Sequence, residues 1–334
     1  MHEQQDATRG DPASRRSGSL RRVRLAALAP AKTKESRHAA APSRHCTGGP
    51  AGAHRRRRSR RAVRPRPAVA HRARRSAGES RLRHHPPRRR PRQAFGPQVD
   101  EALAASRALV VEMLDDADSR SAFETAARLP PGRSLRTLAG PERFERVASR
   151  LSARYGLPAA ATERLTPWAA YLTLSQPPRP QGEIVDAALQ RIARQRGLPV
   201  VPLETAREQI ASIAAVQTGH MLALLEAQAR RHDETIAAID TLLARYLEED
   251  LDGMLQNEEL ALRDEPALRP AYSDLFEQIL VRRSARMVER MRPRLERGGA
   301  FVAIGALHLH GEQGVLALLE RAGWQVRRVE RQRR

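Results

Sequence analysis

Three polar residues follow short apolar segments of the chain, and their types suit acid–base or metal chemistry. They are Glu112, Glu204 and His308, which come after the apolar stretches 108–111, 198–203 and 300–304. Apolar runs of this length predict buried strands. In open α/β sheets, ligands bind beyond the carboxyl ends of the strands, where the loops leave a crevice. We therefore expect Glu112, Glu204 and His308 to converge on one site.

Two carboxylates and an imidazole offer two kinds of chemistry. They can bind a divalent metal such as Mn, Co or Zn that activates water, or they can act as an acid–base pair on a bound substrate. Each residue alone also has a simpler interpretation, because a strand-end Glu often caps or ion-pairs with the next helix and a His beside a glycine is often a hydrogen-bonded loop residue. His310 is a rival for His308, since alternation along an extended segment would point the two side chains in opposite directions. The coincidence of three such residues favours a site.

The segments between these strands read as helices. Helices are expected over 119–128, 141–155, 162–174, 183–196 and 312–321, and a largely helical block over 206–297 with breaks near Arg231, Gly253 and 266–270. A last strand is expected over 324–329. Short apolar strands that alternate with helices predict an α/β fold, here with a mixed, largely buried sheet and a large helical insertion.

An arginine cluster precedes the third strand. Helical spacing places Arg282 and Arg286 on one face, with Arg283 beside them. The cluster could clamp a carboxylate or a phosphate, but a solvated helix face is the preferred interpretation for most of it. The remaining candidates are expected to be structural, with Trp168 and Tyr171 in the core and His220 and His232 at the surface.

The first 94 residues differ in composition from the rest. They hold 27 basic and 5 acidic residues, whereas 95–334 hold 33 of each, so the whole net charge of +22 comes from this segment. A stretch rich in Arg, Ala, Pro and Ser with few large apolar residues is expected to be disordered. We favour the interpretation that it is a GC-rich coding strand translated in the wrong frame or from too early a start. A polybasic arm for nucleic acid or anionic lipid and a targeting sequence are the alternatives. The expected organisation is a disordered segment, 1–94, and one α/β domain, 95–334.

Composition also excludes several classes of protein. The single cysteine, Cys46, allows neither an intrachain disulfide nor a cysteine-based zinc site. No stretch approaches the roughly 20 apolar residues of a membrane span, so no transmembrane span is expected. The balanced charge of 95–334 gives no reason to expect a specific nucleic-acid partner.

The order of several motifs resembles that of one known family, the TraB/PrgY/GumN family. Residues 305–314 resemble its closing "G-x-x-H-L-x-G-x-x-G" stretch, and residues 318–323 its "L-L-x-x-x-G" helix. Residues 109–112 are similar to its "lvvE" strand, 166–170 to its "kPW" segment, and 203–205 with Gln209 to its "LET…Q" segment. The resemblance covers about 95–329.

This resemblance implies a fold related to the Tiki metalloproteases and the erythromycin-esterase-like group. It implies a metal-dependent hydrolytic site with His308 and the turn glycine Gly305, with Glu112 and Glu204 as the two glutamates, and with Arg283 as the arginine of an "R-N" pair. The expected ligands of the divalent metal are His308, Glu112 and Glu204. The substrate class is peptide or a small molecule, because some relatives are tied to peptide-pheromone shutdown, and relatives are often exported although this chain shows no convincing signal peptide.

Two departures from the family pattern bear on activity. Residue 284 is Ser where the family has Asn, and the family's first motif, a strand ending in "G-T-x-H", has no match upstream of Phe95. We therefore expect the chain as written to be inactive and poorly stable. Metal-dependent hydrolysis ranks first among the functions, peptide or pheromone binding without turnover is the alternative, and nucleic-acid binding through the basic segment is third.

Overall fold

The computed structural model describes residues 24–25, 97–178 and 184–329, and the fold is α/β. One sheet has the strand order β1-β4-β2-β3. Its strands are β1 (Arg24–Leu25), β2 (Ala108–Val111), β3 (Val200–Pro202) and β4 (Ala300–Ala303). The predicted α/β fold with a helical insertion is confirmed. The sheet was expected to be mixed, but every pairing between the described strands is parallel, because helices return the chain to the same end of the sheet before each next strand.

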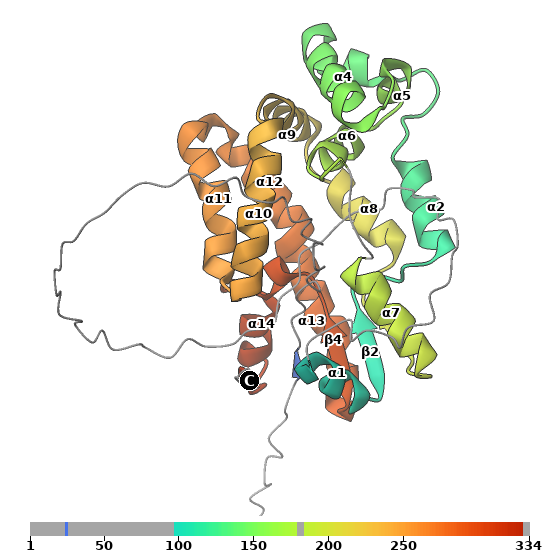
Figure 1. Cartoon of the computed structure of the whole chain (residues 1–334), viewed down its shortest axis with the longest axis vertical. Coiled ribbons are helices and arrows are strands. Elements are labelled where there is room, and N and C mark those ends of the chain that lie inside the picture. Colours follow the sequence, from blue (N-terminus) through green and yellow to red (C-terminus); the bar gives the residue numbers. More distant parts are fainter. Residues whose placement is uncertain (1–23, 26–96, 179–183, 330–334) are drawn as a thin grey trace, which may run out of the picture.

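Helices make up most of the described chain (Figure 1). The α-helices are α1 (Pro97–Ala104), α2 (Ala117–Ala126), α3 (Leu135–Ala139), α4 (Pro141–Tyr155), α5 (Ala159–Glu163), α6 (Pro167–Leu174), α7 (Val185–Gln195), α8 (Ala206–Ala214), α9 (Thr218–Arg230), α10 (His232–Glu248), α11 (Leu251–Asp264), α12 (Arg269–Phe276), α13 (Arg282–Arg297) and α14 (Val315–Arg321). Shorter turns are the 3₁₀ segments η1 (Pro266–Leu268) and η3 (Ala306–Leu309) and the π-helical segment η2 (Glu277–Val281).

Both faces of the sheet are covered by helices. Leu109, Val111 and Phe301 belong to one apolar cluster with side chains of α1 and α7. Val110 and Val302 belong to another cluster with side chains of α13 and α14. This alternation is what a strand with a period of two produces when both faces are buried. It explains why β2 and β4 are continuous apolar runs in the sequence.

Several predicted boundaries shift for local reasons. The helix expected over 162–174 is two helices, because Thr166 caps the start of α6 by accepting a hydrogen bond from the backbone N–H of Ala169 and Pro167 begins that helix. The break expected near Gly253 lies at Glu249, which ends α10 in the left-handed conformation with φ +61°.

The strand expected over 324–329 is wrong. Gln325 forms only an isolated bridge, and no strand is described there. Trp324 and Val326 instead pack into the apolar cluster of α13 and α14. The two residues have the spacing of a strand because both side chains contact the same cluster.

The described part of the Arg-rich segment is limited to two residues. Arg24–Leu25 form β1, which pairs with Phe301 and Val302 of β4. The predicted disorder of the rest of 1–94 concerns residues outside those that the structure describes. Among the described helices, none alone is long and apolar enough to cross a membrane; α8 and α9, which are bent by 88°, meet that test of length and composition only as a pair.

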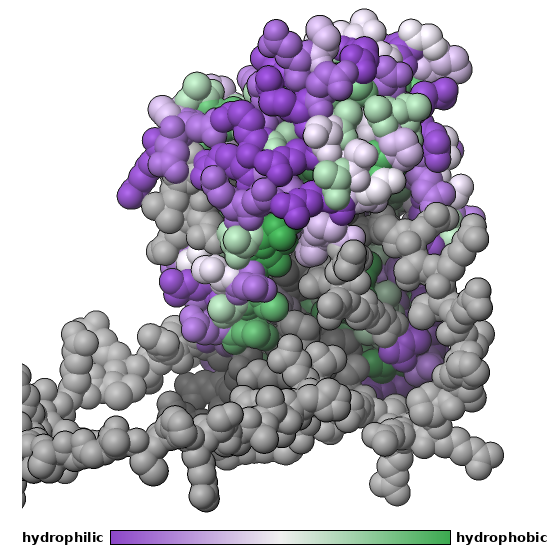
Figure 2. Space-filling view, turned by 45° about the horizontal axis from the view of Figure 1, so that its top comes forward, coloured by the Kyte–Doolittle hydropathy of each residue, from purple (hydrophilic) through white to green (hydrophobic). Residues whose placement is uncertain are grey.

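The helices of the insertion extend beyond the sheet (Figure 1). They have apolar cores of their own. Phe144, Leu151 and Leu225 lie in a cluster that joins α3, α4, α6 and α9. Trp168 is 8% exposed and belongs to a second cluster between α6, α8, α9 and α12, which confirms its expected core role. Hydrophilic residues predominate on the outer end of this insertion, with smaller apolar areas between them (Figure 2).

His232 was expected at the surface, and this expectation is wrong. The residue is fully buried, its Nδ1 lies 3.2 Å from the carbonyl oxygen of Leu174, and its ring lies 5.6 Å from that of Tyr155. Within the described structure its Nε2 has no hydrogen-bond partner. Burial lowers the pKa of His232, the hydrogen bond to Leu174 and the charge of Asp233 oppose this, and the Arg150 and Arg154 guanidinium groups of α4 add to it. The neutral imidazole is the form that this environment favours.

We predict that His232 makes the fold weaker in mild acid. Its pKa is lower in the folded protein than the ordinary value of 6.5, so its contribution is present above that pH and is lost as the pH falls below it. The urea midpoint should drop between about pH 7.5 and about pH 5.5, and His232→Gln should drop less. The other histidines are present in both proteins, so their contributions cancel when the two drops in urea midpoint are compared. An equal drop in both proteins would contradict this role.

Candidate functional site

The sheet register brings the two strand-end glutamates side by side. Val111 of β2 pairs with Pro202 of β3, and the backbone N–H of Glu204 donates to the carbonyl oxygen of Glu112 at 2.8 Å. Ala303 of β4 pairs with Val111 on the other side of β2. The carboxyl ends of the three strands therefore meet at one place, as the sequence predicts.

Glu112 is held on both of its carboxylate oxygens. Oε1 accepts a hydrogen bond from the backbone N–H of Gly305 at 2.6 Å, and Oε2 accepts one from Nη2 of Arg283 at 2.8 Å. The loop that follows Glu112 is also fixed, because the buried side chain of Gln190 bonds the backbone N–H of Asp115 and the carbonyl of Met113, each at 3.0 Å. The carboxylate of Glu112 has a defined position.

Arg283 bridges the two glutamates. Its Nη2 lies 2.7 Å from Oε2 of Glu204 and 2.8 Å from Oε2 of Glu112, and its Nε donates to Glu204 at 2.9 Å. All three side chains are at most 4% exposed. Burial opposes the charged guanidinium, but the charges of Glu112 and Glu204 and their hydrogen bonds outweigh this and raise the pKa of Arg283. Its Nη1 donates to the carbonyl oxygen of Ile279 in the π-helical segment, a helix type often found at functional sites.

Glu204 is engaged by a second arginine. Nε and Nη2 of Arg286 donate to Oε1 of Glu204 at 3.1 and 2.5 Å, and Gln209 Nε2 lies 3.4 Å from Oε2. Arg286 also reaches Oγ of Ser212 on α8. Each oxygen of Glu204 therefore accepts from an arginine, and two guanidinium groups balance the charge of two buried carboxylates.

His308 lies in η3, directly after β4. Its backbone N–H donates to the carbonyl oxygen of Gly305 at 3.0 Å, its side chain is buried, and its Nδ1 lies 2.9 Å from Oγ of Ser284 on α13. A methyl group on Gly305 would lie 2.9 Å from Oε1 of Glu112 and 3.5 Å from Cδ2 of His308. Glycine at 305 is thus what allows the Glu112 carboxylate and the His308 ring to flank the same turn.

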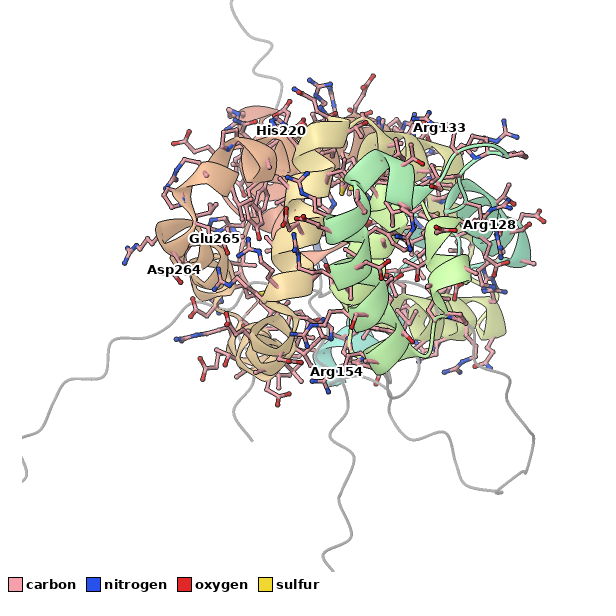
Figure 3. All side chains as sticks on the ribbon, turned by 90° about the horizontal axis from the view of Figure 1, so that it is seen from above. Arg128, Arg133, Arg154, His220, Asp264 and Glu265 are labelled. Atoms are coloured by element: carbon pink, nitrogen blue, oxygen red, sulfur yellow. The ribbon has the colours of Figure 1, made fainter. Side chains whose placement is uncertain are left out.

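The structure separates the expected site residues from their rivals. Glu112, Glu204, Arg283 and His308 come together, whereas His310 lies 3.3 Å from the exposed Asp252 and Arg282 pairs with Glu277 at the surface. His220 of α9 lies at the edge of the helices (Figure 3). Its Nδ1 is 2.9 Å from the carboxylate of Asp274 of α12.

The residue pattern alone did not reveal three contacts at the site. A solvated face was expected for most of the arginine cluster; Arg282 has that position, whereas Arg283, which the family resemblance placed at the site, pairs with both glutamates, and Arg286 reaches Glu204. The contact between Ser284 and His308 was not expected either. The signal was present, because Arg283 precedes the buried Met287 by four residues and so shares the inner face of α13.

The side chains at the site decide whether a metal ion would fit there. In the described part of the chain, no three His, Cys, Asp or Glu side chains are grouped to hold a metal. Glu204 does not suit a ligand role, because arginines occupy both of its oxygens. His308 and Glu112 suit it better: a hydrogen bond at Nδ1 is the usual way in which a metal-binding imidazole is oriented, and the Glu112 carboxylate flanks the same glycine.

We predict that Arg283 is the residue whose loss costs the site most. Arg283→Met leaves Glu112 buried without a counter-charge and leaves Glu204 with Arg286 alone, which should lower the free energy of unfolding by about 3–5 kcal/mol. Arg282→Met is the matched control, since it removes a surface ion pair worth about 0–1 kcal/mol. Urea unfolding measures both. Similar small losses in the two variants would show that the buried bridge does not hold the site together.

Comparison with known proteins identifies the family. The chain matches the model of the TraB/PrgY/gumN family over residues 84–328, which is most of its length. This range includes Glu112, Glu204, Arg283 and His308, which together form the strand-end site. No curated protein and no solved structure matches it. Along the chain the two strand-end glutamates come first, Arg283 on α13 follows, and the turn with Gly305 and His308 comes last. This order agrees with the motifs through which the sequence resembles that family. The chain belongs to the TraB/PrgY/gumN family.

Proposed function

We propose that this protein carries a metal-dependent hydrolase site for a peptide-like substrate at the carboxyl ends of β2, β3 and β4, and that the site is incomplete in this chain because the family's first histidine motif has no match in the sequence. The observation that carries the proposal is the buried turn in which His308, hydrogen-bonded to Ser284 at 2.9 Å, and the Glu112 carboxylate flank Gly305. Imidazole and carboxylate are both metal ligands and proton acceptors. Family membership supports placing this chemistry at the strand ends.

Two groups of residues have different roles in this proposal. His308 and Glu112 would hold a divalent metal, and further donors would come from water or from residues outside the described chain. When bound, such a metal polarises a carbonyl and makes its bound water acidic near neutral pH. Ser284 orients the His308 ring, and the backbone N–H of Gly305 orients Glu112. Arg283, Glu204 and Arg286 form the fixed ionic frame that supports this pair and do not bind the metal.

Peptide capture without turnover is the second candidate. It is favoured by the observation that the described side chains contain no grouped set of three metal donors. In that case the strand-end site would recognise a peptide through its polar groups, and metal affinity would not depend on His308. The two functions therefore differ in a measurement that needs no knowledge of the substrate.

We predict that metal binding requires His308 and not His310. Calorimetric titration of the full chain with Mn²⁺, Co²⁺ and Zn²⁺ should show binding that falls at least about 100-fold in His308→Ala, because a ligand is lost rather than an outer partner. His310→Ala is the matched control and should retain the affinity, since His310 lies beside Asp252 outside the site. Ser284→Ala should weaken binding about 10-fold.

The opposite result would support peptide capture. Equal metal affinity of the original protein, His308→Ala and His310→Ala would exclude His308 as a ligand and with it the hydrolase proposal. Urea unfolding of each variant shows whether a loss of binding reflects the site or the fold.

A further inference from the structure

Three arginines line a hollow at the opposite end of the sheet from the strand-end site. Arg107 directly precedes β2, and Arg294 and Arg297 belong to the last turn of α13, which leads through Gly298 and Gly299 into β4. The hollow has a volume of about 360 Å³. Because β2 and β4 are four residues long, about 13 Å of strand separates it from Glu112 and His308.

Backbone contacts hold two of the three arginines, Arg107 and Arg297, in place. Nη2 of Arg107 donates to the carbonyl oxygens of Arg297 and Gly298, the latter at 2.9 Å, and so covers the end of α13. Gly299 has φ +72°, and a methyl group there would lie 2.8 Å from Nε of Arg107. Nε of Arg297 donates to the carbonyl oxygen of Pro293 at 3.0 Å. These bonds use one nitrogen of Arg107 and one of Arg297, and among the described residues no carboxylate pairs with either guanidinium.

Several groups of neighbouring arginines elsewhere in the described chain share a carboxylate. Four such groups are Arg143 and Arg146 on Glu226, Arg150 and Arg154 on Asp233, Arg230 and Arg231 on Glu265, and Arg283 and Arg286 on Glu204. The three arginines at the hollow do not share a carboxylate in this way. In the described chain, none of Arg107, Arg294 and Arg297 forms an ion pair with a carboxylate, and no acidic residue lines the hollow.

The missing counter-charge indicates what the hollow would bind. Guanidinium groups pair with carboxylate and phosphate oxygens through two parallel hydrogen bonds, and three of them suit an anion with oxygens in several directions. A tetrahedral oxyanion meets this requirement better than a planar carboxylate. The volume exceeds that of one phosphate group and reaches the range of small-molecule sites, so there is room for a small substituent.

We propose that the hollow lined by Arg107, Arg294 and Arg297 is a binding site for a phosphate group carried by a small molecule. The site is separate from the strand-end cluster and does not depend on the hydrolase proposal. Arg294 and Arg297 supply the main contacts, and Arg107 has the double role of covering the end of α13 and of adding positive charge.

The experiment is a calorimetric titration of the full chain with inorganic phosphate and with glycerol 3-phosphate at constant ionic strength. Saturable binding of one ligand per chain is expected, tighter for glycerol 3-phosphate if the phosphate is carried by a small molecule. Arg294→Gln with Arg297→Gln should weaken it about tenfold or more, because charge-assisted hydrogen bonds are lost. Arg294→Gln alone serves as a second variant, since this side chain makes no hydrogen bond within the described structure and its loss should not disturb the fold.

The matched control is Arg292→Gln with Arg321→Gln. Both control residues are exposed and lie outside the hollow, and the charge change is the same. All variants keep the 27 basic residues of 1–94, so unspecific attraction of anions is constant. Retained affinity in the control pair and in His308→Ala is expected. Absence of saturable binding, or equal weakening in both arginine pairs, would overturn the proposal; equal affinity for the two ligands would assign the site to free phosphate instead.

Discussion

Two carboxylates buried at adjacent strand ends are the constraint on which the site depends. Glu112 and Glu204 lie next to each other because β2 and β3 pair in register, and two such charges cannot remain ionised together in a dry interior without a counter-charge. Arg283 supplies positive charge to both, and Arg286 adds a second counter-charge to Glu204. The partners are 171 and 79 residues away in the chain, so the interaction forms only when the whole domain has folded.

This requirement explains the position of α13. The helix packs Met287, Met291 and Leu295 against the sheet, and the same inner face carries Arg283 and Ser284 to the strand ends. Ser284 then contacts His308, so one helix positions both the ionic frame and the imidazole. The π-helical segment directly before α13 adds a carbonyl acceptor for Arg283. Farther along, Arg290 bonds the carbonyl of Leu203 and the side chain of Glu208, which ties α13 to the start of α8.

The sequence predicts the parts of this arrangement that depend on local pattern. Apolar runs reveal β2, β3 and β4, and the residues that follow them locate Glu112, Glu204 and His308 at one edge. Alternation fails at 324–329, because Trp324 and Val326 pack against helices rather than in a sheet. Helical spacing from Met287 places Arg283 on the inner face of α13, but the burial of His232 and the ion pairs of Arg283 with the two glutamates involve residues distant in the chain and are not visible locally. Family motifs located Arg283 at the site, whereas composition alone favours a solvated helix face.

The central claim is that Glu112 and Arg283 act as one buried unit that fixes the site. A double-mutant cycle measures this directly, with urea unfolding of the original protein, Glu112→Gln, Arg283→Met and the double variant. The account predicts a coupling energy of about 2 kcal/mol or more, because Arg283→Met leaves Glu112 buried without its counter-charge, whereas in the double variant that uncompensated carboxylate is gone. Effects that add to within about 0.5 kcal/mol would contradict it, and would mean that the two side chains are independent of each other in the folded protein.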